Sequence, residues 1–199
     1  GGRLVAVTGA GGVGRSTLAM ALATGLAADP RDRGLVLLAD LALHGHLALL
    51  HDAGDVMPGV LELVEAHRGA ELPPDEVRAL TFTLPDRGHD LLLGLRRHRD
   101  WTALRPRACE AALDSLTRTY RHVVADVDAD VEGDEQCGST DVEDRNTLAR
   151  RTHGRADLVL AVGVPGIAGV HSQLRVVRDL IEVGVDPGRI VPVVNRAPR

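Results

Sequence analysis

The 199-residue chain contains no lysine, and all 23 of its basic residues are arginine. Aromatic residues make up only 2% of it, so the core must be packed from aliphatic side chains. The two cysteines, Cys109 and Cys137, are far apart, which argues against a disulfide framework and a cysteine metal site. No apolar run reaches the ~18 residues of a membrane span and no signal peptide opens the chain. We therefore expect a cytoplasmic protein for which membrane contact is not indicated.

Charge and length narrow the class of protein further. A net charge of -5 with 44% hydrophobic residues is typical of an ordinary globular domain. The acidic balance argues against nucleic acid as a partner. The length suffices for one sizeable core. We predict a single domain over residues 1–199, which ends so soon after its last predicted strand that it resembles a fragment of a longer chain.

Apolar runs and helical patterns alternate along the chain. The apolar runs are continuous, which is typical of parallel strands covered on both faces, so we predict an α/β fold with an open, mostly parallel sheet flanked by helices on both faces. Ligands of such sheets bind beyond the carboxyl ends of the strands. A capping-box spacing from Thr140 to Glu143 predicts one helix start. The predicted strands are 4–8, 35–39, 90–95, 122–125, 158–164 and 190–194, and the predicted helices are 16–28, 60–66, 75–80, 105–119, 141–152 and 168–183.

The most informative segment is the glycine-rich turn after the first predicted strand, GAGGVGRST from Gly9 to Thr17. It matches the P-loop pattern G-x-x-x-x-G-K-[ST] with Arg15 in the lysine position, and it also matches the dinucleotide fingerprint G-x-G-x-x-G. In both patterns glycines let backbone N–H groups approach phosphate oxygens, and the next helix adds the positive charge of its N-terminus. The turn predicts a phosphate-bearing ligand and leaves two classes of protein open.

The first class is a Rossmann-type, NAD(P)-dependent oxidoreductase. Asp40, which follows the second predicted strand, stands where an acid would bind the ribose of the cofactor. The short-chain reductases with similar openings use a Tyr-x-x-x-Lys pair, whereas the single tyrosine of this chain, Tyr120, is followed by Val124 at that spacing. The sequence therefore contains a residue suited to bind the cofactor of such an enzyme, but it lacks the catalytic pair.

The second class is a P-loop nucleoside triphosphatase. Ser16 and Thr17 follow the basic residue directly, as Mg²⁺ coordination requires. Asp126 ends the apolar run HVVAD in the manner of a Walker B acid. The glycine turn and the HVVAD segment are joined by three further segments, LVLLADLALHG, ADLVLAVGVPGIAGVHSQLRVVRDL and IVPVVNR. In this order the segments resemble the MinD/ParA superfamily, and the resemblance extends over nearly the whole chain. The resemblance is greatest to its CpaE/TadZ branch, which is tied to Flp pilus assembly and to septum or polar positioning.

This resemblance implies ATP or ADP with Mg²⁺ as the cofactor. It implies that Ser16 coordinates Mg²⁺, Asp126 holds the metal through water, and Thr17 approaches the α-phosphate. Asn195 would meet the adenine edge. The plainer alternatives are that Ser16 and Thr17 cap a helix, Asp126 ends a strand and Asn195 makes a turn. The predicted cofactor-binding residues are Gly9, Gly11, Gly12, Val13, Gly14, Arg15, Ser16, Thr17 and Asn195, and the predicted metal ligands are Ser16 and Asp126.

Three catalytic positions of that superfamily are replaced in this chain. The lysine that reaches across a sandwich dimer is Ala10, the phosphate-binding lysine is Arg15, and the acid that positions the attacking water is Ala42. Each such loss costs on the order of 10²-fold in rate. We therefore predict a degenerate, slow or inactive ATPase, forming a homodimer. Its predicted role is a positioning or assembly factor for a pilus/secretion or division-site machine, with recruitment to a pole or septum.

Histidine and arginine clusters receive plainer interpretations. His44 and His46, with His51 nearby, match a metal site loosely and are expected at the surface. The basic run at 96–99 is expected to be a solvated rim, with contact to a partner or acidic lipid as its alternative.

Two further groups are assigned no function. Asp128 and Asp130 are expected to be solvated loop acids. Leu174, Val177 and Ile181 lie on one stripe of the helix 168–183, which core packing explains.

Overall fold

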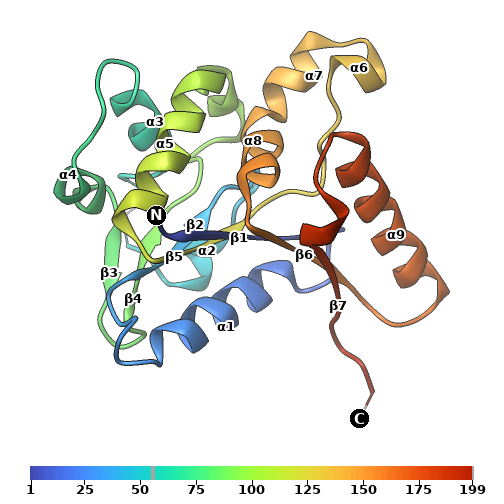
Figure 1. The fold of residues 1–199 in the computed structure, drawn as a ribbon, viewed down its shortest axis with the longest axis horizontal. Helices are drawn as coiled ribbons and strands as arrows, with labels where there is room; N and C mark the ends of the chain where they lie inside the picture. Colours follow the sequence, from blue (N-terminus) through green and yellow to red (C-terminus); the bar gives the residue numbers. More distant parts are fainter. Residues whose placement is uncertain (55–56, 199) are drawn as a thin grey trace.

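The structure is a computed structural model that describes residues 1–54 and 57–198. Its centre is a seven-stranded sheet in the order β3-β4-β2-β5-β1-β6-β7. Neighbouring strands run parallel except for β3, which is antiparallel to β4. Helices lie on both faces of the sheet (Figure 1). This arrangement confirms the predicted α/β fold class.

The described residues form the following elements. The strands are β1 (Arg3–Gly9), β2 (Val36–Asp40), β3 (Phe82–Leu84), β4 (His89–Leu92), β5 (His122–Asp126), β6 (Leu158–Gly163) and β7 (Ile190–Val194). The α-helices are α1 (Arg15–Ala27), α2 (Leu47–Leu50), α3 (Val60–Ala66), α4 (Pro74–Ala79), α5 (Pro106–Thr119), α6 (Asp134–Cys137), α7 (Thr140–Arg145), α8 (Thr147–Arg155) and α9 (Ile167–Glu182). Two 3-10 turns are η1 (His98–Ala103) and η2 (Pro187–Arg189).

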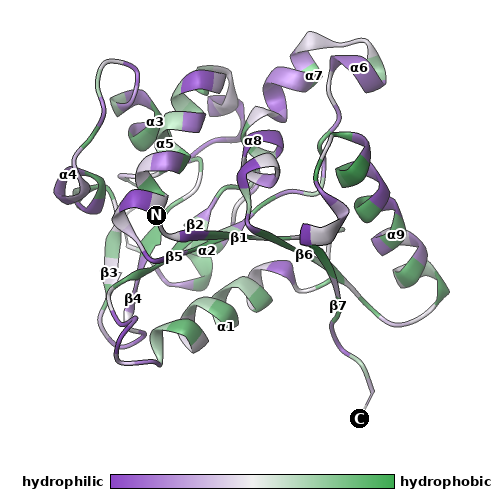
Figure 2. Cartoon of the chain, viewed as in Figure 1, coloured by the Kyte–Doolittle hydropathy of each residue, from purple (hydrophilic) through white to green (hydrophobic). Residues whose placement is uncertain are grey.

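The core consists of two layers, one on each face of the sheet. Helix α1 covers one face, and α5, α8 and α9 cover the other (Figure 1). Successive strand residues point to opposite faces. Leu37 and Val123 therefore pack in the layer of α5, and Leu38 and Val124 in the layer of α1. The central strands are hydrophobic along most of their length (Figure 2) because they are buried on both faces.

The predicted helix 141–152 is interrupted in the structure. It consists of α7 and α8, which meet at Asn146, where the backbone (φ −89°, ψ 4°) leaves the helical range. The N-cap of α7 is Ser139, whose hydroxyl accepts from the backbone N–H of Val142, and Thr140 is the first helical residue. The prediction therefore placed the cap one residue late and missed the break.

Several short elements escaped the sequence prediction. Strand β3 forms an antiparallel hairpin with β4, and it has only three residues, too few to show a period of two. Helices α2 and α6 have four residues each and carry no periodic signal. The predicted strand 90–95 ends earlier than expected, since β4 stops at Leu92.

The predicted burial of the apolar stripe of α9 is wrong in part. Leu174 is 62% exposed and Ile181 is 42% exposed, although Val177 is partly buried. The helix turns a different stripe toward the sheet, and this stripe contains the buried residues Val176 and Leu180. The apolar pattern of α9 is wider than its core contact, so hydrophobicity alone could not identify the buried face.

Candidate functional site

The candidate site lies at the carboxyl ends of β1, β2 and β5. Strand β5 lies between the other two strands, and Asp40 pairs in register with Asp126. The glycine turn after β1 opens beside them, at a cavity of 780 Å³ lined by residues 9–12 and 14–17 and by the loops after β2 and β5. This volume falls within the range of about 300–1,000 Å³ that is usual for small-molecule sites.

The glycine turn adopts a backbone that glycine alone enters easily. Gly14 has a φ of 90°, and a Cβ on it would stand 2.3 Å from the side-chain nitrogen of Asn195. Gly11 differs, because its φ lies outside the left-handed region and a Cβ there would meet no atom of the described chain within 4 Å. Gly11 lines the cavity. The packing of the protein therefore does not require glycine at this position, and the absence of a side chain leaves space for a ligand.

The N-terminus of α1 faces the cavity without a side-chain cap. Its N-cap is Gly14, and its first turn contains no acidic residue. Ser16 and Thr17 line the cavity, and neither hydroxyl has a hydrogen-bond partner within residues 1–54 and 57–198. They therefore do not cap the helix. The partial positive charge of the helix end and these two hydroxyls are available to an anion.

Arg15 turns toward two carboxylates of the β5 end. Its Nε donates to Oδ1 of Asp126 at 2.5 Å, and its Nη1 donates to Oδ1 of Asp128 at 2.9 Å. Burial opposes the charge of the guanidinium, but the two carboxylates outweigh burial and raise the pKa of Arg15. Arg15 also lines the cavity, with its side chain 17% exposed. The predicted phosphate-binding residue is thus engaged by protein acids.

The expectation that Asp128 is a solvated loop acid is wrong. One of its oxygens accepts from Arg15, and the other accepts from the backbone N–H of Leu43 at 2.7 Å. Asp128 therefore ties the loop after β2 to the loop after β5. Asp126 is fully buried, and its Oδ2 has no donor in the described part of the chain.

Asp40 is buried and accepts hydrogen bonds from the loop that follows β2. Its two oxygens accept from the backbone N–H groups of Ala42 at 3.4 Å and Leu47 at 3.0 Å. Burial, with Asp126 adjacent, raises the pKa of Asp40 to about 7. A carboxylate enclosed in this way cannot reach a ribose. Ala42, which takes the position of the water-positioning acid, is itself fully buried.

Asn195 follows β7 and contacts the glycine turn. Its Nδ2 donates to the carbonyl of Val13 at 2.9 Å, and its Oδ1 accepts from the N–H of Arg196 at 2.9 Å. The side chain thus fixes the glycine turn to the end of the sheet. A contact with adenine stays a prediction.

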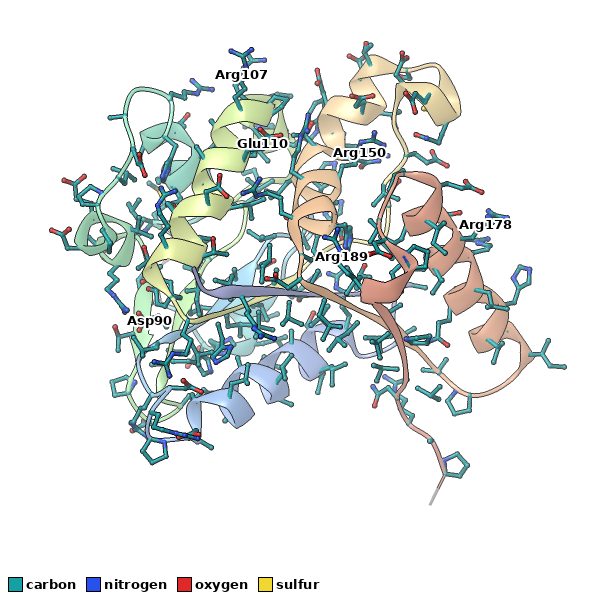
Figure 3. The ribbon with its side chains drawn as sticks, viewed as in Figure 1. Asp90, Arg107, Glu110, Arg150, Arg178 and Arg189 are labelled. Atoms are coloured by element: carbon teal, nitrogen blue, oxygen red, sulfur yellow. The ribbon has the colours of Figure 1, made fainter. Side chains whose placement is uncertain are left out.

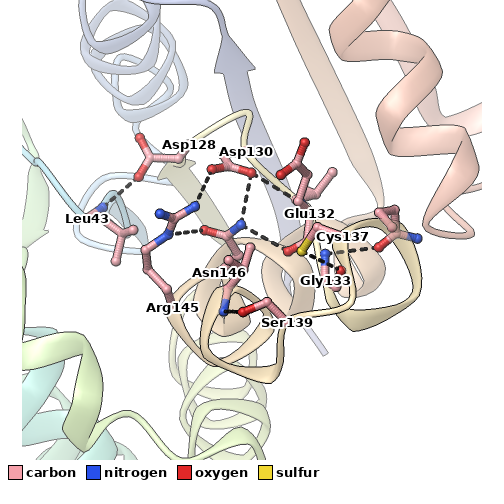
Figure 4. A network of polar contacts seen from close by, with 12 residues as sticks. Leu43, Asp128, Asp130, Glu132, Gly133, Cys137, Ser139, Arg145 and Asn146 are labelled. Atoms are coloured by element: carbon pink, nitrogen blue, oxygen red, sulfur yellow. Dashed lines mark hydrogen bonds and ion pairs between the residues drawn. The ribbon is translucent and has the colours of Figure 1, made fainter.

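A polar network orders the acidic segment between β5 and α8 (Figure 4). Asp130 accepts from Arg145 and from Nδ2 of Asn146, both at 2.9 Å. Nδ2 of Asn146 also donates to the carbonyl of Glu132 at 3.0 Å. Asp130 is exposed, as expected of a solvated loop acid, with 48% of its side chain accessible, and it also accepts these two hydrogen bonds. Sequence reasoning missed Asn146, and its one signal was a residue of low helix propensity inside a predicted helix.

Histidines line the mouth of the cavity. The rings of His44 and His98 are stacked, with centroids 4.1 Å apart, and His46 lies on the same rim. Among residues 1–54 and 57–198, no three His, Cys, Asp or Glu side chains are grouped as a metal site. The lining also contains Arg145 and Arg196 together with the acids Asp128 and Asp130, of which Asp130 is paired with Arg145.

The Rossmann alternative is not favoured by the topology or by Tyr120. The first two strands of a dinucleotide-binding fold are neighbours, whereas β5 separates β1 from β2 here. Tyr120 precedes β5 at the opposite end of the sheet, where its hydroxyl donates to Asp90 at 2.8 Å. Figure 3 labels Asp90. Burial raises the pKa of Tyr120. The residue belongs to the core, with Arg78 lying 4.5 Å from its ring centroid.

Fold and site together define a class: this chain has the fold of the MinD/ParA P-loop proteins. Similar solved structures include a ParA family ATPase from Chlorobium tepidum TLS, with a TM-score of 0.76 and 17% identity over 99% of this chain and 75% of that chain. The septum site-determining protein MinD of Pyrococcus horikoshii OT3, complexed with Mg-ADP, matches with a TM-score of 0.70 and 18% identity over 98% of this chain and 71% of that one.

A third similar structure is a MinC:MinD cell division protein complex from Aquifex aeolicus, with a TM-score of 0.66 and 20% identity over 99% of this chain and 69% of that chain. No protein-family model and no curated protein sequence matches the chain. Within the described ranges, no helix is both long enough and apolar enough to cross a membrane.

Of the two residues predicted to hold Mg²⁺, Ser16 lines the cavity with its hydroxyl unpartnered among the described residues, whereas Asp126 does not fit the ion in this arrangement. Mg²⁺ requires a near-octahedral set of oxygens at about 2.0–2.1 Å. Oδ1 of Asp126 accepts from Arg15, and both oxygens of Asp128 are engaged. The remaining oxygen, Oδ2 of Asp126, is buried. Arg15 holds the position of a cation between the two acids, so coordination by Ser16 and Asp126 stays a prediction that this geometry does not favour.

Proposed function

We propose that the chain binds an adenine nucleotide, ATP or ADP, at the glycine turn and hydrolyses ATP slowly or not at all. The observation that carries this proposal is a phosphate cradle that faces a 780 Å³ cavity while its arginine is held by two protein acids. The uncapped end of α1 and the hydroxyls of Ser16 and Thr17 supply anion contacts. Gly9, Gly11, Gly12, Val13, Gly14 and Asn195 complete the proposed nucleotide site.

The binding test compares nucleotides by thermal unfolding. A ligand that binds only the folded state raises the melting temperature, so ATP or ADP should raise it and NADPH should not. Gly11→Val should abolish the shift, because the added side chain enters the cavity without meeting the fold. Gly25→Val in α1, where a Cβ also meets no described atom within 4 Å, is the matched control and should keep the shift. A shift with NADPH alone would instead support an oxidoreductase.

The proposed loss of hydrolysis rests on Ala10, Arg15 and Ala42. Phosphate release under excess ATP should be far below ~1 s⁻¹, the low end of typical turnover. A rate near that value would contradict the proposal and show that Arg15 replaces the lysine. The combined reversion Ala10→Lys, Arg15→Lys and Ala42→Asp should raise the rate, and the three effects should be non-additive because they share one ligand. Ala42 is fully buried, so the unfolding temperature of this variant must be measured alongside the rate.

We further propose a homodimer that acts as a positioning or assembly factor for a pilus/secretion or division-site machine, in the manner of the CpaE/TadZ branch. The MinC:MinD complex of similar fold supports a role in protein assembly. Because Ala10 has no charge to send across a dimer, light scattering should give the same mass with and without nucleotide. A nucleotide-dependent shift from monomer to dimer would refute this. A fluorescent fusion should gather at a pole or septum, and a diffuse signal would contradict that role.

A further inference from the structure

We infer that Arg15 replaces the metal ion of this site, so that nucleotide phosphates bind here without Mg²⁺. The inference rests on the proposed nucleotide binding and adds how the phosphate charge is neutralised. It starts from the one basic side chain within the glycine turn, which contacts the same acid that the sequence predicts as a metal ligand.

The charges around Arg15 are those of a metal site with an arginine in place of the metal. Asp126 is fully buried and Asp128 is one-quarter exposed, and both direct an oxygen at the guanidinium. A buried carboxylate without a cation is costly by several kcal/mol in principle, so Asp126 requires a partner at all times. Arg15 supplies it from within the chain.

The guanidinium has a further donor for a ligand. Its Nε and Nη1 are used by the two acids, whereas Nη2 has no acceptor within the part of the chain that the structure describes. Because Arg15 also lines the cavity, Nη2 can donate to a phosphate oxygen while the other two nitrogens stay in place. The three nitrogens of a planar guanidinium can each donate to a different acceptor in this way. A lysine has a single ammonium nitrogen and cannot reproduce this geometry.

Among the described residues, the acids bound to Arg15 leave one oxygen without a donor, Oδ2 of Asp126, and this oxygen is buried. Both oxygens of Asp128 have donors, and the two oxygens of Asp40 accept from the backbone. A Mg²⁺ ion would have to displace Arg15 and then stand beside its displaced positive charge. Phosphate neutralisation falls instead to Arg15, to the end of α1 and to Arg196 on the cavity lining.

Isothermal titration of the wild-type chain with ADP, in excess MgCl₂ and in EDTA, tests the inference. The two dissociation constants should agree within about threefold, which corresponds to a difference in binding free energy below about 0.7 kcal/mol. Tightening by about tenfold or more with Mg²⁺ would overturn the inference and leave nucleotide binding intact. Absence of binding in both buffers would remove the proposed function and this inference with it.

Arg15→Lys provides the matched variant, and Arg175→Lys on the exposed face of α9 is its control. The lysine variant should bind ADP more tightly with Mg²⁺ than without, and it should deplete the free Mn²⁺ signal in electron paramagnetic resonance when ADP is present. The wild type and the Arg175→Lys control should not deplete it. A Mg²⁺-independent Arg15→Lys variant would contradict the role given to Arg15, and if that variant fails to fold the wild-type comparison decides alone.

Discussion

Asp40 and His153 are buried titratable residues whose pKa values shift in opposite directions. Burial, with Asp126 beside it, raises the pKa of Asp40 from 3.8 to about 7. Burial lowers the pKa of His153 from 6.5 to about 4, and its neutral ring donates through Nε2 to the carbonyl of Asp128 at 2.9 Å. Below pH 7 the folded protein therefore keeps a neutral carboxyl beside Asp126, and above pH 4 it keeps a neutral imidazole.

These two residues should make opposite contributions to the pH dependence of stability. Between pH 4 and 7 the folded state keeps a proton on Asp40 that the unfolded state has lost, so this contribution falls as pH rises. Between pH 4 and 6.5 the unfolded state protonates His153 and the folded state does not, so that contribution rises with pH. Each amounts to a few kcal/mol at most.

Urea unfolding across this pH range should separate the two contributions. The wild type should show a shallow profile, Asp40→Asn a stability that rises with pH, and His153→Gln a stability that falls with pH. Parallel profiles for the three proteins would contradict the assignment. Both variants change the hydrogen bonds of a buried side chain, so the slopes of the profiles, and not the absolute stabilities, test the assignment.

Sequence patterns predicted which residues meet at the site but not how their side chains pair. Parallel strands bring their carboxyl ends to one edge, so the glycine turn, Asp126 and Asn195 could be expected together. The direction of a long side chain could not be predicted in this way. Arg15 contacts an acid 111 residues away in the sequence, and this contact depends on how deeply Asp126 is buried in the sheet. No sequence pattern indicated the contacts of Asp128, because its partners are the backbone N–H of Leu43 and the side chain of Arg15.

At the scale of elements, the break between α7 and α8 is held by one buried amide. Asn146 donates to both Asp130 and the carbonyl of Glu132. Asn146→Ala should therefore lower the free energy of unfolding by roughly 1–3 kcal/mol, because the two hydrogen bonds of a buried amide are lost. Asp144→Ala, two residues earlier and exposed, should stay within about 0.5 kcal/mol of the wild type. Equal losses in chemical denaturation would show that the break is held by packing instead.

Elements with strong periodicity were predictable and short ones were not. The central strands are buried on both faces, and their apolar runs identify them within one or two residues. The helix break is different, because Asn146 is stabilised by tertiary hydrogen bonds that no local pattern reveals. The three-residue β3 exists only through its pairing with β4.

At the scale of the whole molecule, α9 has one buried and one exposed apolar stripe. Leu180 is fully buried on the sheet side, whereas Leu174 is 62% exposed. Leu180→Ala should cost about 2–5 kcal/mol of unfolding free energy through lost burial and a cavity. Leu174→Ala should change it by less than about 0.5 kcal/mol. A comparable loss at Leu174 in urea unfolding would show that this face is covered in solution.

The central place of β1 has a consequence for the synthesis of the protein. This strand is translated before the other strands of the sheet, yet its two neighbours are β5 and β6, and Gly9 gains its β6 partner only after Val162 has been translated. Pairings so distant in sequence close slowly and leave an apolar strand unpaired in the meantime. The glycine turn therefore becomes rigid only after β6 has been made, and a ligand held there requires residues 1–163 to be present.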